Sequence, residues 1–353
     1  MNAKNLGFTL ILIITLITAC EKDPATPPDL PSNFTNGVFI INEGPYNNGT
    51  GTLSFLKRDG SSVYHNIYQQ ANSLIPLGNI VQSMTIINNV AYIAVNNANK
   101  IELANAENMV SIGTIDNINY PAYIIQSGAN KAYVSSWDNV VYVISTDGTE
   151  IIGQIPVGNG PSRMLTINDK VWVLNQGWFS VDSTISVIDP STDQVIKTID
   201  LYPRPSGICQ DKNGLVWVMC SGKGYWQNGA TKGHLVSVDP VNYEVQNDFI
   251  FPDTINYPES LVIDNQLQTL FYNYANGIYN FDINASTLNE SAFIHRQGKF
   301  YSLGYDDIDN VLYASDPVDY NQNGWVFRYS AESGATIDSI KAGIAPVNYS
   351  FVD

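Results

Sequence analysis

The sequence is poor in positive charge. Its 353 residues include 17 Lys and Arg against 33 Asp and Glu, which gives a formal net charge of -16. No Lys/Arg-rich stretch offsets this balance, and a negative surface repels phosphate backbones and anionic lipid headgroups. The composition therefore argues against nucleic acid as a partner and against direct binding to an anionic bilayer surface.

Residues typical of metal and nucleophilic sites are also scarce. The only histidines are His65, His234 and His295, which lie far apart in the chain. There is no His-x-x-x-His, no Cys-His spacing and no Gly-x-Ser-x-Gly elbow. We therefore expect no catalytic residue, no metal and no cofactor.

Cysteine occurs three times, and two copies lie close together in the sequence, Cys209 and Cys220. They flank an expected hairpin with its turn at Asp211 to Gly214, which puts Cys209 opposite Val216 or Trp217. Cys220 is then about 10 Å further along its strand, too far for a cross-strand disulfide. We predict two buried free thiols.

A long apolar run occurs only near the N-terminus, from Leu6 to Ile17 after Lys4. A short apolar run followed by small residues is typical of a secretory signal, which we assign to residues 1–19. The third cysteine, Cys20, follows directly, as in bacterial lipoprotein signals, which implies lipidation at Cys20. Residues 20–36 are rich in proline and are predicted to be the lipid anchor and an extended tether. The acidic residues at 21–23 resemble the export signal of surface lipoproteins of Bacteroidetes, which implies an outer-membrane, cell-surface location.

Aromatic residues and turn formers are plentiful, and they recur with a fixed period. Proline or a substitute, followed by a short apolar strand, occurs at intervals of about 40 to 53 residues. These positions are Val81, Pro121, Pro161, Pro205, Pro258, Phe300 and Pro346. Each interval predicts four strands separated by turns, which is the pattern of a propeller blade.

The two ends of the repeat region are incomplete. The segment Val38 to Gly44 aligns with Val171 to Gly177, so the first repeat begins at its second strand. The chain ends on an unpartnered first strand, Pro346 to Val352. We predict that these fragments complete one blade and close an all-β, seven-bladed propeller over residues 37–353.

These repeats resemble the YVTN or YncE-like seven-bladed β-propellers. In such a ring, the loops from second to third strands and the links between blades open on one face. Here those segments are rich in aromatic and amide side chains, which suit a large ligand with flat apolar faces and polar edges. The predicted ligand-binding residues are Tyr46, Trp137, Arg163, Asn175, Gln176, Trp178, Arg204, Tyr225, Trp226, Asn273, Tyr274 and Tyr320.

Catalytic alternatives have little support in these loops. Asp306, Asp307 and Asp309 fall in an expected turn on the opposite face, and we predict a solvated turn there rather than a calcium site. A propeller lactonase needs several channel ligands, and only Glu259 and Asn348 are candidates. A metal-dependent lactonase-like hydrolase is therefore the third hypothesis, and we expect the protein not to be an enzyme.

The opening from Gly37 to Gly44, with Gly51 to Phe55 after it, resembles the surface-layer-type propeller lipoproteins of Bacteroidetes. Some of these capture cobalamin and pass it to a TonB-dependent transporter. The resemblance implies a surface-anchored protein that binds a bulky nutrient, a corrinoid above all, and delivers it to such a transporter, with the membrane reached only through the N-terminal lipid. The alternative is an envelope scaffold whose aromatic loops bind other proteins.

Overall fold

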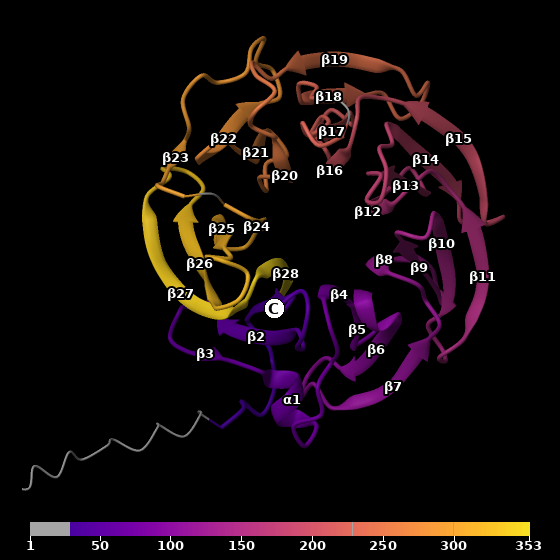
Figure 1. Cartoon of the computed structure of the whole chain (residues 1–353), viewed down its shortest axis with the longest axis vertical. Coiled ribbons are helices and arrows are strands. Elements are labelled where there is room, and N and C mark those ends of the chain that lie inside the picture. Colours follow the sequence, from indigo (N-terminus) through magenta and orange to yellow (C-terminus); the bar gives the residue numbers. More distant parts are fainter. Residues whose placement is uncertain (1–28, 228, 299) are drawn as a thin grey trace, which may run out of the picture.

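The computed structural model describes residues 29–227, 229–298 and 300–353, which form a ring of seven four-stranded antiparallel sheets (Figure 1). The predicted all-β, seven-bladed propeller is confirmed. We label the blades A to G around the ring, beginning with the blade that contains the first strand of the chain. In each blade the first strand lies at the central channel and the fourth at the outer edge.

The strands of each blade are given from the channel outward. Blade A is β28 (Pro346–Val352), β1 (Gly37–Asn42), β2 (Thr52–Lys57) and β3 (Val63–Tyr64). Blade B is β4 (Val81–Ile87), β5 (Val90–Val95), β6 (Lys100–Asn105) and β7 (Ser111–Asp116). Blade C is β8 (Pro121–Gly128), β9 (Lys131–Ser136), β10 (Val140–Ser145) and β11 (Ile151–Pro156). Blade D is β12 (Pro161–Ile167), β13 (Lys170–Asn175), β14 (Thr184–Asp189) and β15 (Gln194–Asp200).

The remaining blades follow the same order. Blade E is β16 (Pro205–Gln210), β17 (Val216–Cys220), β18 (His234–Val238) and β19 (Val245–Ile250). Blade F is β20 (Glu259–Ile263), β21 (Thr269–Tyr274), β22 (Gly277–Asp282) and β23 (Ile294–His295). Blade G is β24 (Leu303–Asp306), β25 (Val311–Asp316), β26 (Asn323–Ser330) and β27 (Thr336–Ile344). Helical structure in the described residues is limited to α1 (Ile67–Ala71) and a 3-10 turn (Asn96–Ala98).

In each of the seven blades, the second strand carries an aromatic residue at the same position, and these side chains fill the core between blades. These seven side chains are Phe39, Tyr92, Tyr133, Trp172, Trp217, Phe271 and Tyr313, and all are fully buried. The second strands are covered on both faces by neighbouring blades, so their burial is continuous rather than alternating. Fourth strands such as β19 are mostly exposed because only one of their faces meets a neighbour. The repeat seen in the sequence is therefore a repeat of core packing.

The ring is closed by pairing of the two chain ends. Strand β28 lies antiparallel to β1, in a register that runs from Gly37 opposite Val352 to Asn42 opposite Pro346. This pairing supplies the innermost strand of blade A and leaves β1 with no open edge, as the sequence predicted.

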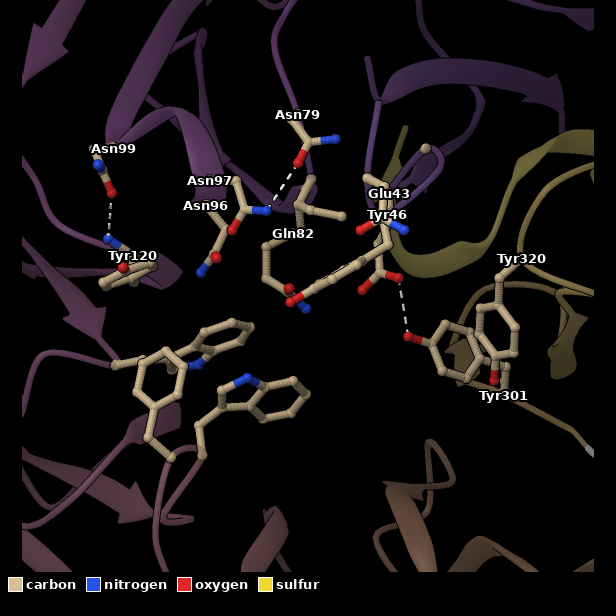
Figure 2. Close-up of a pocket in the computed structure, with 16 residues that line it drawn as sticks. Glu43, Tyr46, Asn79, Gln82, Asn96, Asn97, Asn99, Tyr120, Tyr301 and Tyr320 are labelled. Carbon is tan, nitrogen blue, oxygen red and sulfur yellow. Dashed lines mark hydrogen bonds between the residues drawn. The ribbon is translucent and has the colours of Figure 1, made fainter. Parts of the chain in front are cut away.

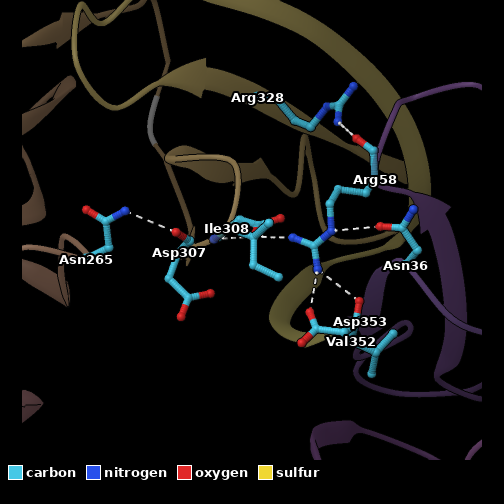
Figure 3. Close-up of polar contacts among 9 residues, drawn as sticks. Asn36, Arg58, Asn265, Asp307, Ile308, Arg328, Val352 and Asp353 are labelled. Atoms are coloured by element: carbon cyan, nitrogen blue, oxygen red, sulfur yellow. Dashed lines mark hydrogen bonds and ion pairs between the residues drawn. The ribbon is translucent and has the colours of Figure 1, made fainter.

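A buried arginine reinforces the closure (Figure 3). Arg58 donates to Oδ1 of Asn36 at 3.1 Å and to the carbonyl of Val352 at 2.9 Å, and it forms a buried ion pair with Asp306 of blade G. The prediction of a solvated turn is therefore wrong for Asp306, which is 1% exposed, because the carboxylate is the counter-ion of Arg58. The neighbouring Asp307 and Asp309 are exposed.

The packed domain begins slightly before the predicted boundary. Phe34, placed in the tether by the sequence analysis, is 3% exposed and packs on Phe39 and Phe55. The signal segment and Cys20 lie outside the described residues. No helix within 29–227, 229–298 and 300–353 is long and apolar enough to cross a bilayer.

The two later cysteines are free and buried. Cys209 pairs with Trp217 in the ladder between β16 and β17, and Cys220 lies opposite Pro205. Burial raises the pKa of the Cys220 thiol to about 12. The predicted pair of buried free thiols is confirmed.

Candidate functional site

The entry into each blade is a recurring backbone feature that directs side chains to the channel mouth. The residue just before the first strand has left-handed backbone in five blades, at Ile80, Tyr120, Gly160, Arg204 and Ala345. Residues other than glycine rarely adopt this backbone conformation, so its recurrence is a property of the junction between blades. Ile80, Tyr120 and Arg204 all line cavities at the mouth of the channel.

Three cavities meet at this mouth. The face cavity, of about 830 Å³, has walls from blades A, B, C, D and G. The channel cavity, of about 190 Å³, has walls from all seven blades, mostly at the starts of their first strands. The side cavity, of about 230 Å³, lies over blades F and G. Tyr301 lines all three, so the cavities adjoin one another at this side chain, and we refer to them together as the depression.

One wall of the face cavity is aromatic and bridges two blades. Trp137 follows β9 in blade C, and Trp178 follows β13 in blade D. Their rings stack at 4.2 Å with an interplanar angle of 14°. Phe179 meets Trp137 and Tyr120 edge to face. Trp137 is largely buried by this packing, whereas about half of the Trp178 side chain remains exposed, and it lines the face cavity.

The facing wall is built of amides from blade B (Figure 2). Asn97 donates to Oδ1 of Asn79 at 2.8 Å, and Oδ1 of Asn99 accepts from the backbone of Tyr120 at 2.9 Å. Gln82 projects into the same space and makes no hydrogen bond through its side chain within the described residues. The cavity thus offers flat apolar surface on one side and hydrogen-bonding groups on the other.

A carboxylate and a tyrosine meet where the face and channel cavities join. The hydroxyl of Tyr301 donates to Oε2 of Glu43 at 2.9 Å (Figure 2). Burial raises the pKa of Glu43 from 4.5 to about 7, and the hydrogen bond from Tyr301 opposes this rise. Burial and the charge of Glu43 in turn hold the pKa of Tyr301 well above its usual range. Near neutral pH this pair can accept a hydrogen bond from a ligand or, when Glu43 is protonated, donate one.

The side cavity contains a buried amide that has no partner. Asn273 is 5% exposed, and within the described chain neither its Nδ2 nor its Oδ1 forms a hydrogen bond. Its cross-strand neighbours are Glu259 and Ile278. The next residue, Tyr274, is fixed by a hydrogen bond of 2.7 Å to Asp253. A buried polar group without a partner is costly, so Asn273 is suited to bind a polar atom of a ligand.

Two arginines line the channel cavity. Arg163 lies over the ring of Tyr123 at 4.8 Å, and Arg204 is fixed through its backbone, which donates to Asp182 at 2.9 Å and accepts from Ser221 at 2.9 Å. In the part of the chain that the structure describes, neither guanidinium forms an ion pair.

Most residues predicted from the sequence come together at this depression. The face cavity contains Tyr46, Trp137, Trp178 and Tyr320; the channel cavity contains Arg163, Gln176, Trp178 and Arg204; the side cavity contains Asn273, Tyr274 and Tyr320. They come from loops separated by up to 274 residues only because the ring closes.

Three predicted residues lie outside the cavities. Asn175 is fully buried, and its amide donates to Thr184 at 2.9 Å and to Ser186 at 3.0 Å. This corrects its assignment as a ligand contact, since the side chain ties β13 to β14 and lines none of the three cavities. Tyr225 and Trp226 are 80% and 60% exposed and line none of the three cavities.

The predicted set of ligand-binding residues left out several wall residues, above all Glu43, Gln82 and Tyr301. Each lies at the start of a first strand or the end of a second strand, next to the repeating proline position. Their closeness to the repeating proline position was the available signal, because residues at the channel end of each blade point to a common centre.

The histidines stay apart, as their sequence positions indicated. His65 contacts Ser54, His234 contacts Asp248, and His295 contacts the carbonyl of Asn276. Among the described residues, no group of three His, Cys, Asp or Glu side chains could hold a metal ion.

The fold defines the class as a seven-bladed β-propeller, here with a depression at one mouth of its channel. A family model described as "Domain of unknown function (DUF5074)" matches residues 36–345, so the chain belongs to this family. A comparison with curated proteins found no match.

Solved structures with the same fold have little sequence in common with the chain. A quinonprotein alcohol dehydrogenase-like protein from Bacteroides thetaiotaomicron is 14% identical with a TM-score of 0.67, covering 90% of this chain and 79% of that one. A hydrazine synthase of Kuenenia stuttgartiensis is 13% identical with a TM-score of 0.59, covering 92% of this chain and 91% of that one. At such identities the likeness shows the fold alone.

Proposed function

We propose that the protein is a surface-anchored receptor that binds a corrinoid in the depression and delivers it to a TonB-dependent outer-membrane transporter. The observation that carries the proposal is the face cavity of about 830 Å³, with stacked tryptophans on one wall and amides on the other. A corrin is a broad ring with apolar faces and a rim of amide side chains. Such a ligand is complementary to both walls at once.

The anchor belongs to the same proposal. Cys20 would carry the lipid, and the proline-rich segment after it would let the propeller face a membrane partner. In this arrangement the exposed Tyr225 and Trp226 lie on the rim of the binding face, where they would contact the transporter rather than the ligand.

The test is calorimetric titration of cyanocobalamin into the purified full-length protein. We expect saturable binding with one ligand per chain. An absence of heat and of any change in the corrin absorbance spectrum at micromolar protein would refute the corrinoid assignment.

An envelope scaffold that binds only proteins is the second candidate. The exposure of Tyr225 and Trp226 outside the cavities favours it, because large exposed aromatics are typical of protein interfaces. Replacing both by Ser separates the two functions. A receptor would lose transporter contact but keep ligand binding, whereas a scaffold would have no ligand to keep.

A further inference from the structure

The channel cavity has an unusual charge distribution for so acidic a chain. Of the 17 Lys and Arg residues, Arg163 and Arg204 both line this one small space of about 190 Å³. They come from the adjacent blades D and E, while Glu43 belongs to blade A. The positive charge is therefore concentrated on one side of the channel mouth.

Arg163 is fixed through its guanidinium and Arg204 through its backbone, and within the described residues neither guanidinium is neutralised by an ion pair. Arg163 rests on the ring of Tyr123, and the backbone of Arg204 is fixed on both sides by hydrogen bonds. By contrast, other arginines of the described chain are paired: Arg58 with Asp306, Arg296 with Asp316, and Arg328 with Asp338. Positioned guanidiniums without a protein carboxylate are suited to bind oxygen pairs of an external anion.

Two carboxylates line the same cavity, and neither forms an ion pair with Arg163 or Arg204 in the part of the chain that the structure describes. Glu43 accepts a hydrogen bond from Tyr301, and burial raises its pKa to about 7, so part of its population is neutral near pH 7. Glu259 lies on blade F, beside Asn273. Of these two carboxylates, Glu43 on blade A lies across the ring from Arg163 and Arg204, whereas Glu259 belongs to blade F, which packs against blade E.

We propose that Arg163 and Arg204 form an oxyanion subsite that takes the phosphodiester group of the ligand held in the adjoining face cavity. The inference rests on the proposed function and names the part of the ligand that enters the channel. Trp178 lines both cavities, so a ligand stacked on its ring is directly beside the arginines. The corrin would cover the aromatic wall while its phosphate-bearing tail extends to the channel mouth.

The test compares two probes on two variants. Cyanocobalamin carries the phosphodiester, and dicyanocobinamide is the corrin without its phosphate-linked nucleotide. We expect the double variant Arg163→Gln/Arg204→Gln to bind cyanocobalamin about tenfold or more weakly, because it lacks the charged donors that would bind the phosphodiester oxygens. Its affinity for dicyanocobinamide should equal that of the wild type.

A matched control removes the same charge from the rim. Lys223 and Lys232 lie in the loop between β17 and β18 and line none of the three cavities. The variant Lys223→Gln/Lys232→Gln should bind both probes as the wild type does. Added salt should weaken the binding of cyanocobalamin to the wild type and have little effect on the arginine variant.

The outcomes separate the two proposals. Suppose that both corrinoids bind the wild type. If the arginine variant then keeps its affinity for both, or its affinity for both falls by the same factor, the oxyanion subsite is refuted and the receptor function stands. If neither corrinoid binds, the receptor function for corrinoids is refuted, and phenyl phosphate becomes the probe. Binding of phenyl phosphate to the wild type but not to the arginine variant would support the oxyanion subsite. If phenyl phosphate does not bind the wild type, the subsite is refuted as well.

Discussion

The indole rings of Trp137 and Trp178 stack at 4.2 Å although they belong to different blades. The two residues are 41 positions apart and occupy equivalent second-to-third-strand loops. Phe179 braces Trp137 from the side, which fixes the orientation of the pair. One exposed aromatic face is thereby held ready for a ligand without further ordering, which reduces the entropic cost of binding.

Replacing Trp178 by Ala should weaken ligand binding with little effect on folding. The side chain is 51% exposed, so its removal leaves the core intact, but it removes the stacking surface shared by the face and channel cavities. We expect the affinity for cyanocobalamin to fall about tenfold, which corresponds to about 1.4 kcal/mol. Trp226→Ala is the control, since that residue is 60% exposed and lies outside the cavities. Equal losses in both variants would contradict the assignment.

Two buried asparagines should respond in opposite ways to substitution. Asn175 holds Thr184 and Ser186, so Asn175→Leu should lower the free energy of unfolding by about 1–3 kcal/mol. Asn273 has no partner, and the aligned position in blade D is Leu174. Asn273→Leu should therefore leave stability unchanged or raise it, while weakening ligand binding. Urea unfolding measures the stability of both variants, and calorimetry measures their ligand binding. A destabilised Asn273→Leu protein would show that the amide is structural.

The pH dependence of stability should reflect Glu43. Its pKa in the folded protein is about 7, against 4.5 for the ordinary group, so the folded state binds more protons than the unfolded state between these values. Raising the pH through this window therefore removes stability. Relative to the wild type, Glu43→Gln should gain in free energy of unfolding from about pH 4.5 to about 7 and then level off. Glu150→Gln removes an exposed carboxylate and controls for the change in net charge. A constant difference between wild type and Glu43→Gln across this range would refute the assignment.

Breaking the closure contact should be costly. Arg58→Met leaves Asp306 buried without its counter-ion, and we expect a loss of about 3–5 kcal/mol in urea unfolding. The control is Lys170→Met, which breaks a partly exposed pair with Asp189 and should cost less than about 1 kcal/mol. If the two variants lose similar amounts, Arg58 does not stabilise the closed ring in the way its contacts indicate.

Much of the fold could be predicted because the relevant signal is local and repeated seven times. The aromatic position exemplified by Trp172 and Trp217, and the prolines that start first strands, define each blade without knowledge of the others. Closure could also be predicted, since the missing strand before Val38 and the surplus strand from Pro346 are complementary.

The candidate site could be predicted only in part, because loop composition does not say which way a side chain points. Trp178 and Asn175 are three residues apart and were both expected at the ligand, but only one faces the cavity. Asp306 looked like part of a solvated turn because nothing in its neighbourhood reveals Arg58, 248 residues away.

The sequence by itself determined the blade, its repetition and the closure of the ring, because these follow from strand periodicity, proline positions and a recurring buried aromatic. Only the tertiary structure decided which polar groups lie together at the channel mouth. Glu43 and Tyr301 form a hydrogen bond, and Arg163 and Arg204 line one cavity, because the blade junctions point to a common centre. That convergence depends on the curvature of the whole ring, which no local stretch of residues encodes.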